Sequence, residues 1–408
     1  MQQEWTPQGP QPAPQPGAQP EPWQDAQPAP WQDAQPAPQP DVPPEPQPGL
    51  PPEPQPGPQP EPQPDVPPAP WQDAQPAPQP DVPPGPWQNP QPEPPQTPPA
   101  FLPFGRACSR VGWAFAALML LFTLGQLLFV WAFRRLLPGR LSVTLELWLC
   151  NDLALYGLGA PVCWLLLRRL PRRLPPPCRP ARPARMNLPW AGRLFCLGEL
   201  CMIAGSLAGQ GLMRIIGYWA GAQGAGNPVA AALDGASVFT IFVFCVLAAP
   251  VGEELLFRGL LFRCLAPFGE RAYILISAAL FSAFHGNLYQ IPGAFLAGLL
   301  LAWLRCRTGR LRWGMLLHAA LNFCGAVMPY LIIANDALAG LWVLALLGFC
   351  IAGGVYLFRM RPARQLRAMP PLPGRRGAAL LNPGMLAAAL LSAVLLAANT
   401  LGSIGVLL

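Results

Sequence analysis

Long apolar stretches alternate with short polar segments through the last three hundred residues of the chain. A helix needs roughly 20 apolar residues to cross a hydrocarbon core of about 30 Å. Seven stretches meet this length, near residues 111–133, 143–167, 190–213, 237–262, 313–333, 339–358 and 384–408. The pattern therefore predicts an all-α, polytopic membrane domain over residues 106–408.

Two further apolar stretches, residues 272–286 and 291–305, are shorter than a spanning helix usually is. Gly286, Asn287 and the turn around Pro292 separate them. They predict either two short spans or a buried re-entrant hairpin, which is tolerated only where protein or water satisfies its backbone groups. With both counted, we expect a membrane helix bundle of about nine spans.

The arginines favour one orientation of this bundle. Seven lie within residues 168–185, four within 305–312 and six within 359–376, and nine spans bring all three clusters to one side. Short cytoplasmic loops carry the excess of positive charge, so this side is predicted to be cytoplasmic. Three arginines within residues 134–140 fall on the opposite side and argue against this orientation, but they are outnumbered.

Residues 1–105 differ sharply in composition from the rest. The first hundred residues hold 39 of the 59 prolines and 12 of the 20 acidic residues. Such a segment cannot bury enough apolar surface to offset the entropy of ordering, so we expect a disordered Pro/Gln-rich tail, on the cytoplasmic side. The repeat PWQDAQPAP at Pro22, Pro30 and Pro70 favours polyproline II. It predicts a stiff spacer, or alternatively a ligand for a partner with an aromatic-lined groove.

The charged residues and the cysteines limit which partners and which cysteine roles the sequence predicts. All 27 basic residues are arginine, and the formal net charge is +7. A lack of lysine beside abundant Ala, Gly and Pro is typical of genomic base-composition bias, so we infer no nucleic-acid partner. The eleven cysteines show no C-x-x-C spacing and lie mostly in apolar stretches, which predicts small core residues. The expected location is the bacterial plasma membrane.

Polar residues inside the apolar stretches are costly and mark candidate functional sites. The only two histidines, His285 and His318, both fall inside apolar helical segments, as does the adjacent acidic pair Glu253 and Glu254. Counted from the basic end of each span, these residues lie roughly 9 to 20 Å deep. We therefore expect three segments to point carboxylate, imidazole and amide groups into one cavity.

Residues four apart share one face of a helix, and three such pairs occur here. The pairs are Glu254 with Arg258, Phe281 with His285, and His318 with Asn322. Each pair gives its helix one concentrated polar or aromatic edge. Purely structural interpretations exist: Glu254 and Arg258 could form a structural ion pair, and Phe281 could serve core packing. The three pairs together nevertheless favour a functional site.

The residue types suggest a hydrolytic site. Two adjacent carboxylates repel each other, and a guanidinium restores the charge of one. We expect Glu254 to pair with Arg258, and Glu253 to act as the general base that takes a proton from water, held by His285.

The remaining two polar residues suit the other half of this reaction. His318 and Asn322 would donate hydrogen bonds to the oxyanion formed when water attacks a peptide carbonyl. Phe281 would pack beside His285 and keep water out.

At these residues the sequence resembles the CAAX-protease and bacteriocin-processing family of intramembrane peptidases, in its type II CAAX prenyl endopeptidase branch. The family's three motifs stand here as EELLFRG at residues 253–259, FSAFH at 281–285 and HAALN at 318–322. The resemblance covers roughly residues 236–330. It implies an intramembrane endopeptidase that acts on a membrane-associated or lipidated peptide in the lipid bilayer, with the roles given above.

The metal requirement stays open in the sequence. Glu253, His285 and His318 could hold zinc with one open coordination position, but the local H-E-x-x-H arrangement is missing, and a metal-free Glu-activated water explains Asn322 equally well. Two other functions are alternatives: a non-proteolytic bacteriocin-immunity or peptide-binding scaffold that uses the same pocket, and a proton-coupled transporter. A transporter would predict a second copy of the motif region, and we find none.

Overall fold

The structure is a computed structural model that describes residues 101–176, 183–222, 226–332, 335–362 and 379–405, together with Met369 and Gly377. All of these lie in the second of two units, Pro90–Leu408. The Pro/Gln-rich segment of the first hundred residues lies outside the described residues, and so do Cys178 and most of the arginines of the 359–376 cluster. The disorder predicted for the tail therefore stays a prediction.

The described secondary structure is entirely helical, as predicted. In chain order the α-helices are α1 (Phe104–Leu136), α2 (Val143–Asp152), α3 (Ala160–Leu167), α4 (Leu188–Trp219), α5 (Pro228–Leu233), α6 (Val238–Ile241), α7 (Ala249–Glu254), α8 (Leu261–Leu265), α9 (Glu270–Phe284), α10 (Ile291–Thr308), α11 (Leu311–Asn322), α12 (Met328–Ile332), α13 (Asp336–Met360) and α15 (Pro383–Ser403). Four π-helical segments join some of them: η1 (Leu153–Gly159), η3 (Phe242–Ala248), η4 (Leu255–Leu260) and η6 (Phe323–Val327). The 3₁₀ turns η2 (Leu170–Arg173) and η5 (Ala266–Phe268) end two of the longer stretches.

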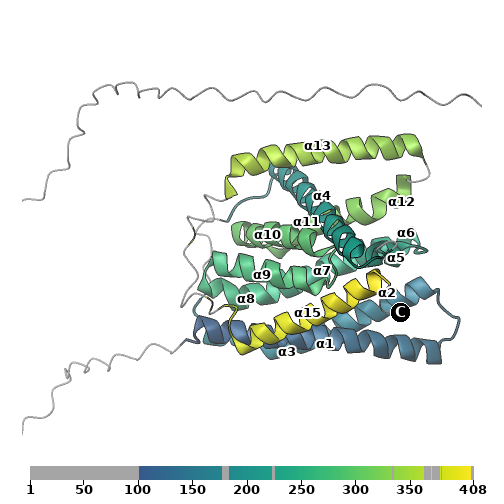
Figure 1. Cartoon of the computed structure of the whole chain (residues 1–408). Coiled ribbons are helices and arrows are strands. Elements are labelled where there is room, and N and C mark those ends of the chain that lie inside the picture. The colour runs from purple at the N-terminus through teal and green to yellow at the C-terminus, as the bar shows by residue number, and fades with distance from the viewer. Residues whose placement is uncertain are drawn as a thin grey trace, which may run out of the picture. The chain divides into compact units, whose positions relative to one another are not determined.

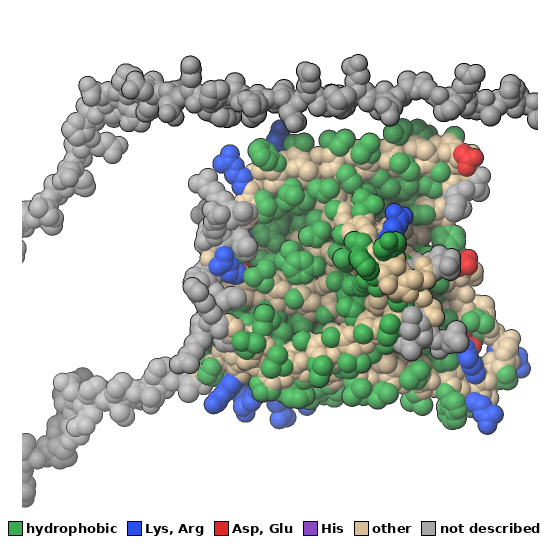
Figure 2. Space-filling view, in the orientation of Figure 1, with side chains coloured by type: hydrophobic (Ala, Val, Ile, Leu, Met, Phe, Trp, Pro, Cys, Tyr) green, Lys and Arg blue, Asp and Glu red, His purple; other side chains and the backbone are tan. Residues whose placement is uncertain are grey.

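Seven continuous helical stretches among the described residues are long and apolar enough to cross a membrane. They are Phe104–Leu136, Val143–Arg173, Leu188–Trp219, Val238–Phe268, Leu311–Ile332, Asp336–Met360 and Pro383–Ser403. They coincide with the seven long spans predicted from the sequence, while the predicted total of nine is not confirmed, because α9 and α10 do not meet these criteria. Exposed leucines and phenylalanines cover the outward faces of these helices, as an integral membrane protein requires, and hydrophobic side chains dominate the face in Figure 2.

Polar residues just before the helices fix where several of them begin. The side chains of Asn187, Asn335 and Asn382 each accept a hydrogen bond from the backbone N–H three residues further on. A proline follows Asn187 and Asn382 within the first turn, where its missing N–H costs nothing. These caps start α4, α13 and α15 at positions that the sequence itself specifies.

Helices α9 and α10 form an antiparallel hairpin inside the bundle. Figure 1 shows α10 beside α9 and α15 beside α1, with α4 crossing α10 obliquely and packing against α13. The turn between α9 and α10 is satisfied by protein groups: Asn399 of α15 donates to the Gly286 carbonyl at 2.8 Å, and Asn287 donates to the His285 carbonyl at 3.0 Å. These contacts supply the backbone partners that the buried-hairpin alternative requires.

One end of the bundle gathers most of the described arginines. Backbone hydrogen bonds join Leu102 to Arg173 and Ala184 to Arg307 at this end, and Arg307 also pairs with Glu270. Figure 2 shows arginines at the left-hand end, and a second, smaller group at the lower right. The bundle thus brings the described parts of the predicted clusters to one end, whether or not the hairpin crosses the membrane.

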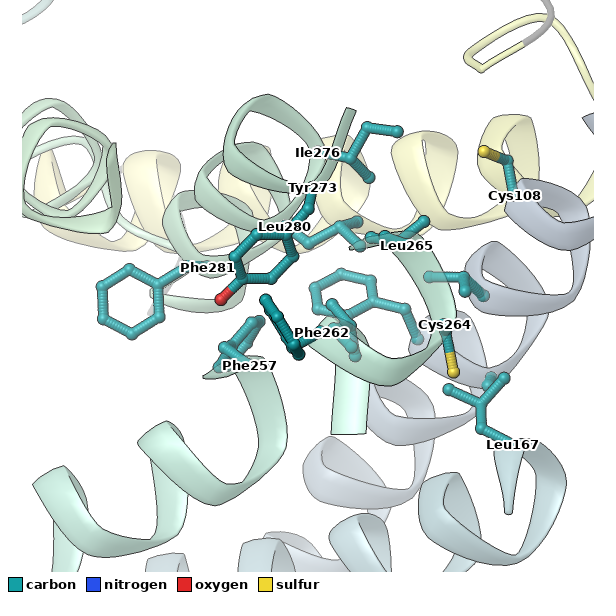
Figure 3. Packing of buried hydrophobic residues seen from close by; sticks show 14 of the residues in the cluster. Cys108, Leu167, Phe257, Phe262, Cys264, Leu265, Tyr273, Ile276, Leu280 and Phe281 are labelled. Carbon is teal, nitrogen blue, oxygen red and sulfur yellow. The ribbon is translucent and has the colours of Figure 1, made fainter. Parts of the chain in front are cut away.

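The core beside the hairpin is aromatic. Figure 3 shows Phe257, Phe262, Tyr273 and Phe281 meeting where the 238–268 stretch packs against α9. The Phe257 and Phe281 rings lie 5.1 Å apart edge to face, and the Phe262 and Tyr273 rings 4.9 Å apart. Such contacts hold the stretch that carries the two glutamates against the helix that carries His285.

Candidate active site

The acidic pair lies in the middle of the 238–268 stretch, between two π-helical segments. Glu254 and Arg258 are both fully buried, and their side chains form an ion pair of 3.0 Å one helical turn apart. Arg258 also donates to the Gly298 carbonyl of α10 at 3.3 Å and stacks on the Phe281 ring at 4.3 Å. The guanidinium therefore neutralises Glu254 and binds this stretch to α9 and α10.

His318 of α11 lies against both glutamates. Its Nδ1 atom is 3.4 Å from Glu254 Oε1, and its Nε2 atom is 3.8 Å from Glu253 Oε2. Gly314, one turn earlier on the same helix, makes this approach sterically feasible, because a Cβ there would lie 2.5 Å from Glu254 Oε2. Two of the three predicted motifs thus meet directly.

Glu253 and Glu254 differ in environment although they are adjacent. The Glu254 side chain is inaccessible, whereas the Glu253 side chain keeps 12% of its surface exposed. Glu253 is also the carboxylate that faces His318 Nε2 beyond hydrogen-bond distance. Of the two carboxylate side chains, only that of Glu253 therefore keeps an accessible part, while its Oε2 atom, which faces His318, is buried without a hydrogen-bond partner.

His285 follows the last residue of α9 and is held by its own helix. Its Nδ1 atom lies 2.8 Å from the Phe281 carbonyl oxygen. Because a carbonyl can only accept, Nδ1 carries the proton and Nε2 of the neutral ring keeps its lone pair. Phe281 contacts the rings of His285 and His318, at centroid distances of 4.9 and 5.8 Å, so one phenyl ring connects the two imidazoles.

Asn322 connects α11 to the stretch that carries the glutamates. Its side-chain amide donates to the Cys245 carbonyl at 2.8 Å. Cys245 lies in η3, where the π-helical geometry alters the regular backbone pairing. The amide thus lies on the His318 helix, one turn beyond the imidazole, with one of its two N–H groups engaged.

The predicted site residues therefore come together in two ways. Glu254 lies within 4 Å of Arg258 and of His318, and His318 lies within 4 Å of Glu253, while His285 joins them through Phe281 and Asn322 through Cys245. Among the described residues, no three His, Cys, Asp or Glu side chains are grouped so as to hold a metal ion. Glu253, His285 and His318 do not form such a group, so the chemistry below is derived from the side chains alone.

Two residues near the site were missed in the sequence. On the 143–173 stretch, the Tyr156 ring packs on Gly252, the residue before Glu253, and Asp152 lies four residues before Tyr156. The two residues are four apart on one span, but the pair contains neither a histidine nor a second acid, and it was not singled out in the sequence. The signal present was an acid within an apolar stretch, which applies equally to the buried Glu199 of α4.

Comparison with known families gives one match. Residues 235–324 match the family model described as Type II CAAX prenyl endopeptidase Rce1-like. All six residues predicted for the site lie within the matched residues, and the match confirms the resemblance that the three motifs indicate. No curated protein and no solved structure matches the chain.

Proposed function

From this match and the site geometry, we propose that the chain is a glutamate-dependent intramembrane endopeptidase that cleaves a membrane-associated or lipidated peptide. One observation carries the proposal. Glu253 lies partly exposed beside a neutralised Glu254–Arg258 pair and faces His318 within a bundle of apolar helices. Ionisable groups are rarely brought together at such depth for stability alone, because desolvation cancels much of the gain.

Glu253 is the proposed general base. Since Arg258 neutralises Glu254, the remaining carboxylate is the one able to take a proton. The 3.8 Å between Glu253 and His318 Nε2 leaves both atoms able to contact one water or substrate oxygen. His285, whose ring contacts the same Phe281 ring as His318, is the proposed second acceptor for that water, through its Nε2 atom.

The reaction then follows ordinary hydrolysis. Glu253 accepts a proton from water as the oxygen bonds to the scissile carbonyl carbon, which places negative charge on the carbonyl oxygen. His318 and the second N–H of Asn322 donate to that oxyanion. The carbon–nitrogen bond breaks as the proton held by Glu253 passes to the leaving amine, so the carboxylate is restored.

Substrate class and setting extend the proposal. The description of the matched family names a prenyl endopeptidase, so the proposed substrate carries a lipid or a membrane anchor that delivers its peptide bond to the buried site. We place the protein in the bacterial plasma membrane with its Arg-rich end and N-terminal tail cytoplasmic. The repeats of the tail remain predicted as a spacer or as a ligand for a groove-type partner.

Comparative peptidomics of membranes tests the proposed function. Cells expressing the native chain should release peptides that are absent from cells expressing Glu253→Ala at equal abundance. Glu146→Ala is the matched control, because Glu146 lies on a neighbouring span in an ion pair with Arg134, whose side chain is 63% exposed, and should not alter the peptides. Identical peptidomes from the native and Glu253→Ala proteins, with the cellular phenotype retained by Glu253→Gln, would favour a non-proteolytic peptide-binding protein.

A further inference from the structure

The 143–173 stretch brings a third acidic residue to the site. Asp152 lies four residues before Tyr156, whose ring packs on Gly252, the residue before Glu253. Asp152 is therefore on the face of this stretch that approaches the proposed base. None of the three motifs includes it.

Tyr156 fixes the contact between the two stretches. It lies one turn after Asp152 on the same face, and its ring packs directly on Gly252, the residue before Glu253. A Cβ at position 252 would overlap the tyrosine ring. Only glycine allows this approach, so the backbone beside the proposed base is built around Tyr156.

The backbone at Asp152 follows the pattern of two of the proposed site residues. A π-helical segment begins directly after Asp152, as one does after Glu254 and another after Asn322. Such segments are uncommon and concentrate at functional sites, because the extra residue re-aims side chains within a helix. This local geometry marks Asp152 independently of its charge.

A pocket of about 300 Å³ lies beside Asp152 at the end of the bundle opposite the Arg-rich end, and Asn151 lines it. Its lining is mainly apolar, and its polar groups come from Gln126, Thr144, Trp148 and Asn151. Since one water occupies about 30 Å³ in the liquid, a pocket of this volume has room for several waters.

Two amide side chains extend the pocket towards the acid. Gln126 donates to the Asn151 side-chain oxygen at 3.0 Å, and Asn151 donates to Asp152 at 3.4 Å. The amides thus form a continuous chain from the pocket to the Asp152 carboxylate. Buried polar chains of this kind are retained where each member has a partner.

We propose that Asp152 and Tyr156 are positioning residues of the peptidase, which orient the attacking water at Glu253, and that this water arrives through the Gln126–Asn151 pocket. The inference rests on the proposed function. It assigns water entry to the end of the bundle opposite the Arg-rich end. No bond in the substrate is broken by Asp152 or Tyr156; they act through water and Glu253.

Kinetics of the purified full chain test the roles of the two residues. With a peptide substrate recovered from the peptidomic comparison, Asp152→Asn and Tyr156→Phe should lower kcat by about 10- to 100-fold and leave KM within about twofold. Gln126→Leu and Asn151→Leu should lower kcat in the same way, while Gln210→Leu, which removes a surface amide of α4, should not. Unchanged kcat in Asp152→Asn would overturn the positioning role, and unchanged kcat in both pocket variants would overturn the water route.

A double-mutant cycle on thermal unfolding needs no activity. If Asp152 acts beside Glu253, as proposed, Asp152→Asn and Glu253→Gln each remove one of two interacting acidic groups, so their effects on unfolding should be non-additive. Glu146→Gln with Glu253→Gln should be additive. Additive effects of Asp152→Asn and Glu253→Gln on unfolding would overturn the placement of Asp152 near Glu253. If the two substitutions are coupled but the native chain hydrolyses no peptide, the proposed function is refuted, and with it the role of Asp152 in orienting water.

Discussion

At the scale of single residues, the proposed site depends on the different environments of two adjacent glutamates. Glu254 is fully buried and paired with Arg258, while Glu253 remains partly exposed. The sequence predicted this division from the i,i+4 spacing of Glu254 and Arg258, because that spacing is local. It could not predict Asp152, because the approach of two helices far apart in the chain leaves no local pattern in either one.

Removal of the Arg258 guanidinium should destabilise the protein strongly. Arg258→Met leaves Glu254 charged and unpaired, which costs about 3–5 kcal/mol. The double variant Arg258→Met with Glu254→Gln should recover part of that loss in the free energy of unfolding. Arg134→Met removes a comparable pair with an arginine that is 63% exposed and should change stability by about 0–1 kcal/mol. A similar cost for both arginine variants would contradict the neutralising role of Arg258.

Gly314 should tolerate no side chain. A Cβ there would lie 2.5 Å from Glu254 Oε2, so Gly314→Ala should cost about 1–3 kcal/mol in unfolding and separate His318 from the glutamates. Gly325→Ala, further along the same stretch, meets open space and is the control. The midpoint of thermal unfolding and the rate of hydrolysis should both fall in Gly314→Ala and stay unchanged in Gly325→Ala. Equal midpoints and rates in the two variants would show that α11 does not approach Glu254 closely.

At the scale of elements, the length of the apolar stretches predicted the long spans, but not whether the two short segments cross the membrane or form a re-entrant hairpin. Residues 272–286 and 291–305 fitted either two spans or a re-entrant hairpin, because length alone does not distinguish them. The structure supplies partners for the turn from α15 and from the hairpin itself. Those partners lie more than a hundred residues away or depend on the turn geometry, so the sequence pattern did not contain them.

The hairpin is held by close backbone contact with α4. Gly205 of α4 faces Gly293 of α10, and a Cβ at position 205 would overlap the Gly293 backbone. Gly205→Val should therefore push α10 away from α4 and lower the free energy of unfolding by about 1–3 kcal/mol. Gly211→Val, on the same helix but facing open space, should have little effect in the same thermal assay. Equal midpoints for both variants would count against the observed packing of α10.

At the scale of the whole molecule, the arginines predicted correctly which helix ends lie together. Helix directions alternate, so the described parts of the 168–185 and 305–312 clusters share one end. Charge counting succeeds here because orientation depends on loops rather than on side-chain contacts. The cytoplasmic assignment of that end stays a prediction.

Reporter fusions test the orientation. A periplasm-dependent reporter such as alkaline phosphatase should be active when fused after Gly139 and inactive when fused after Gly309, because these residues lie at opposite ends of the bundle. A cytoplasm-dependent fluorescent reporter should give the reverse pattern. Phosphatase activity at Gly309 without activity at Gly139 would invert the predicted topology, although the site itself would be unaffected.

The most direct test of the account is hydrolysis by the purified chain in ¹⁸O-labelled water. If Glu253 activates water for direct attack on the peptide carbonyl, the native protein and Glu146→Gln should place the label in the new carboxylate at equal rates, and Glu253→Gln should release no product. Cleavage by Glu253→Gln at the native rate would contradict the assignment of Glu253 as the base on which the proposed function depends.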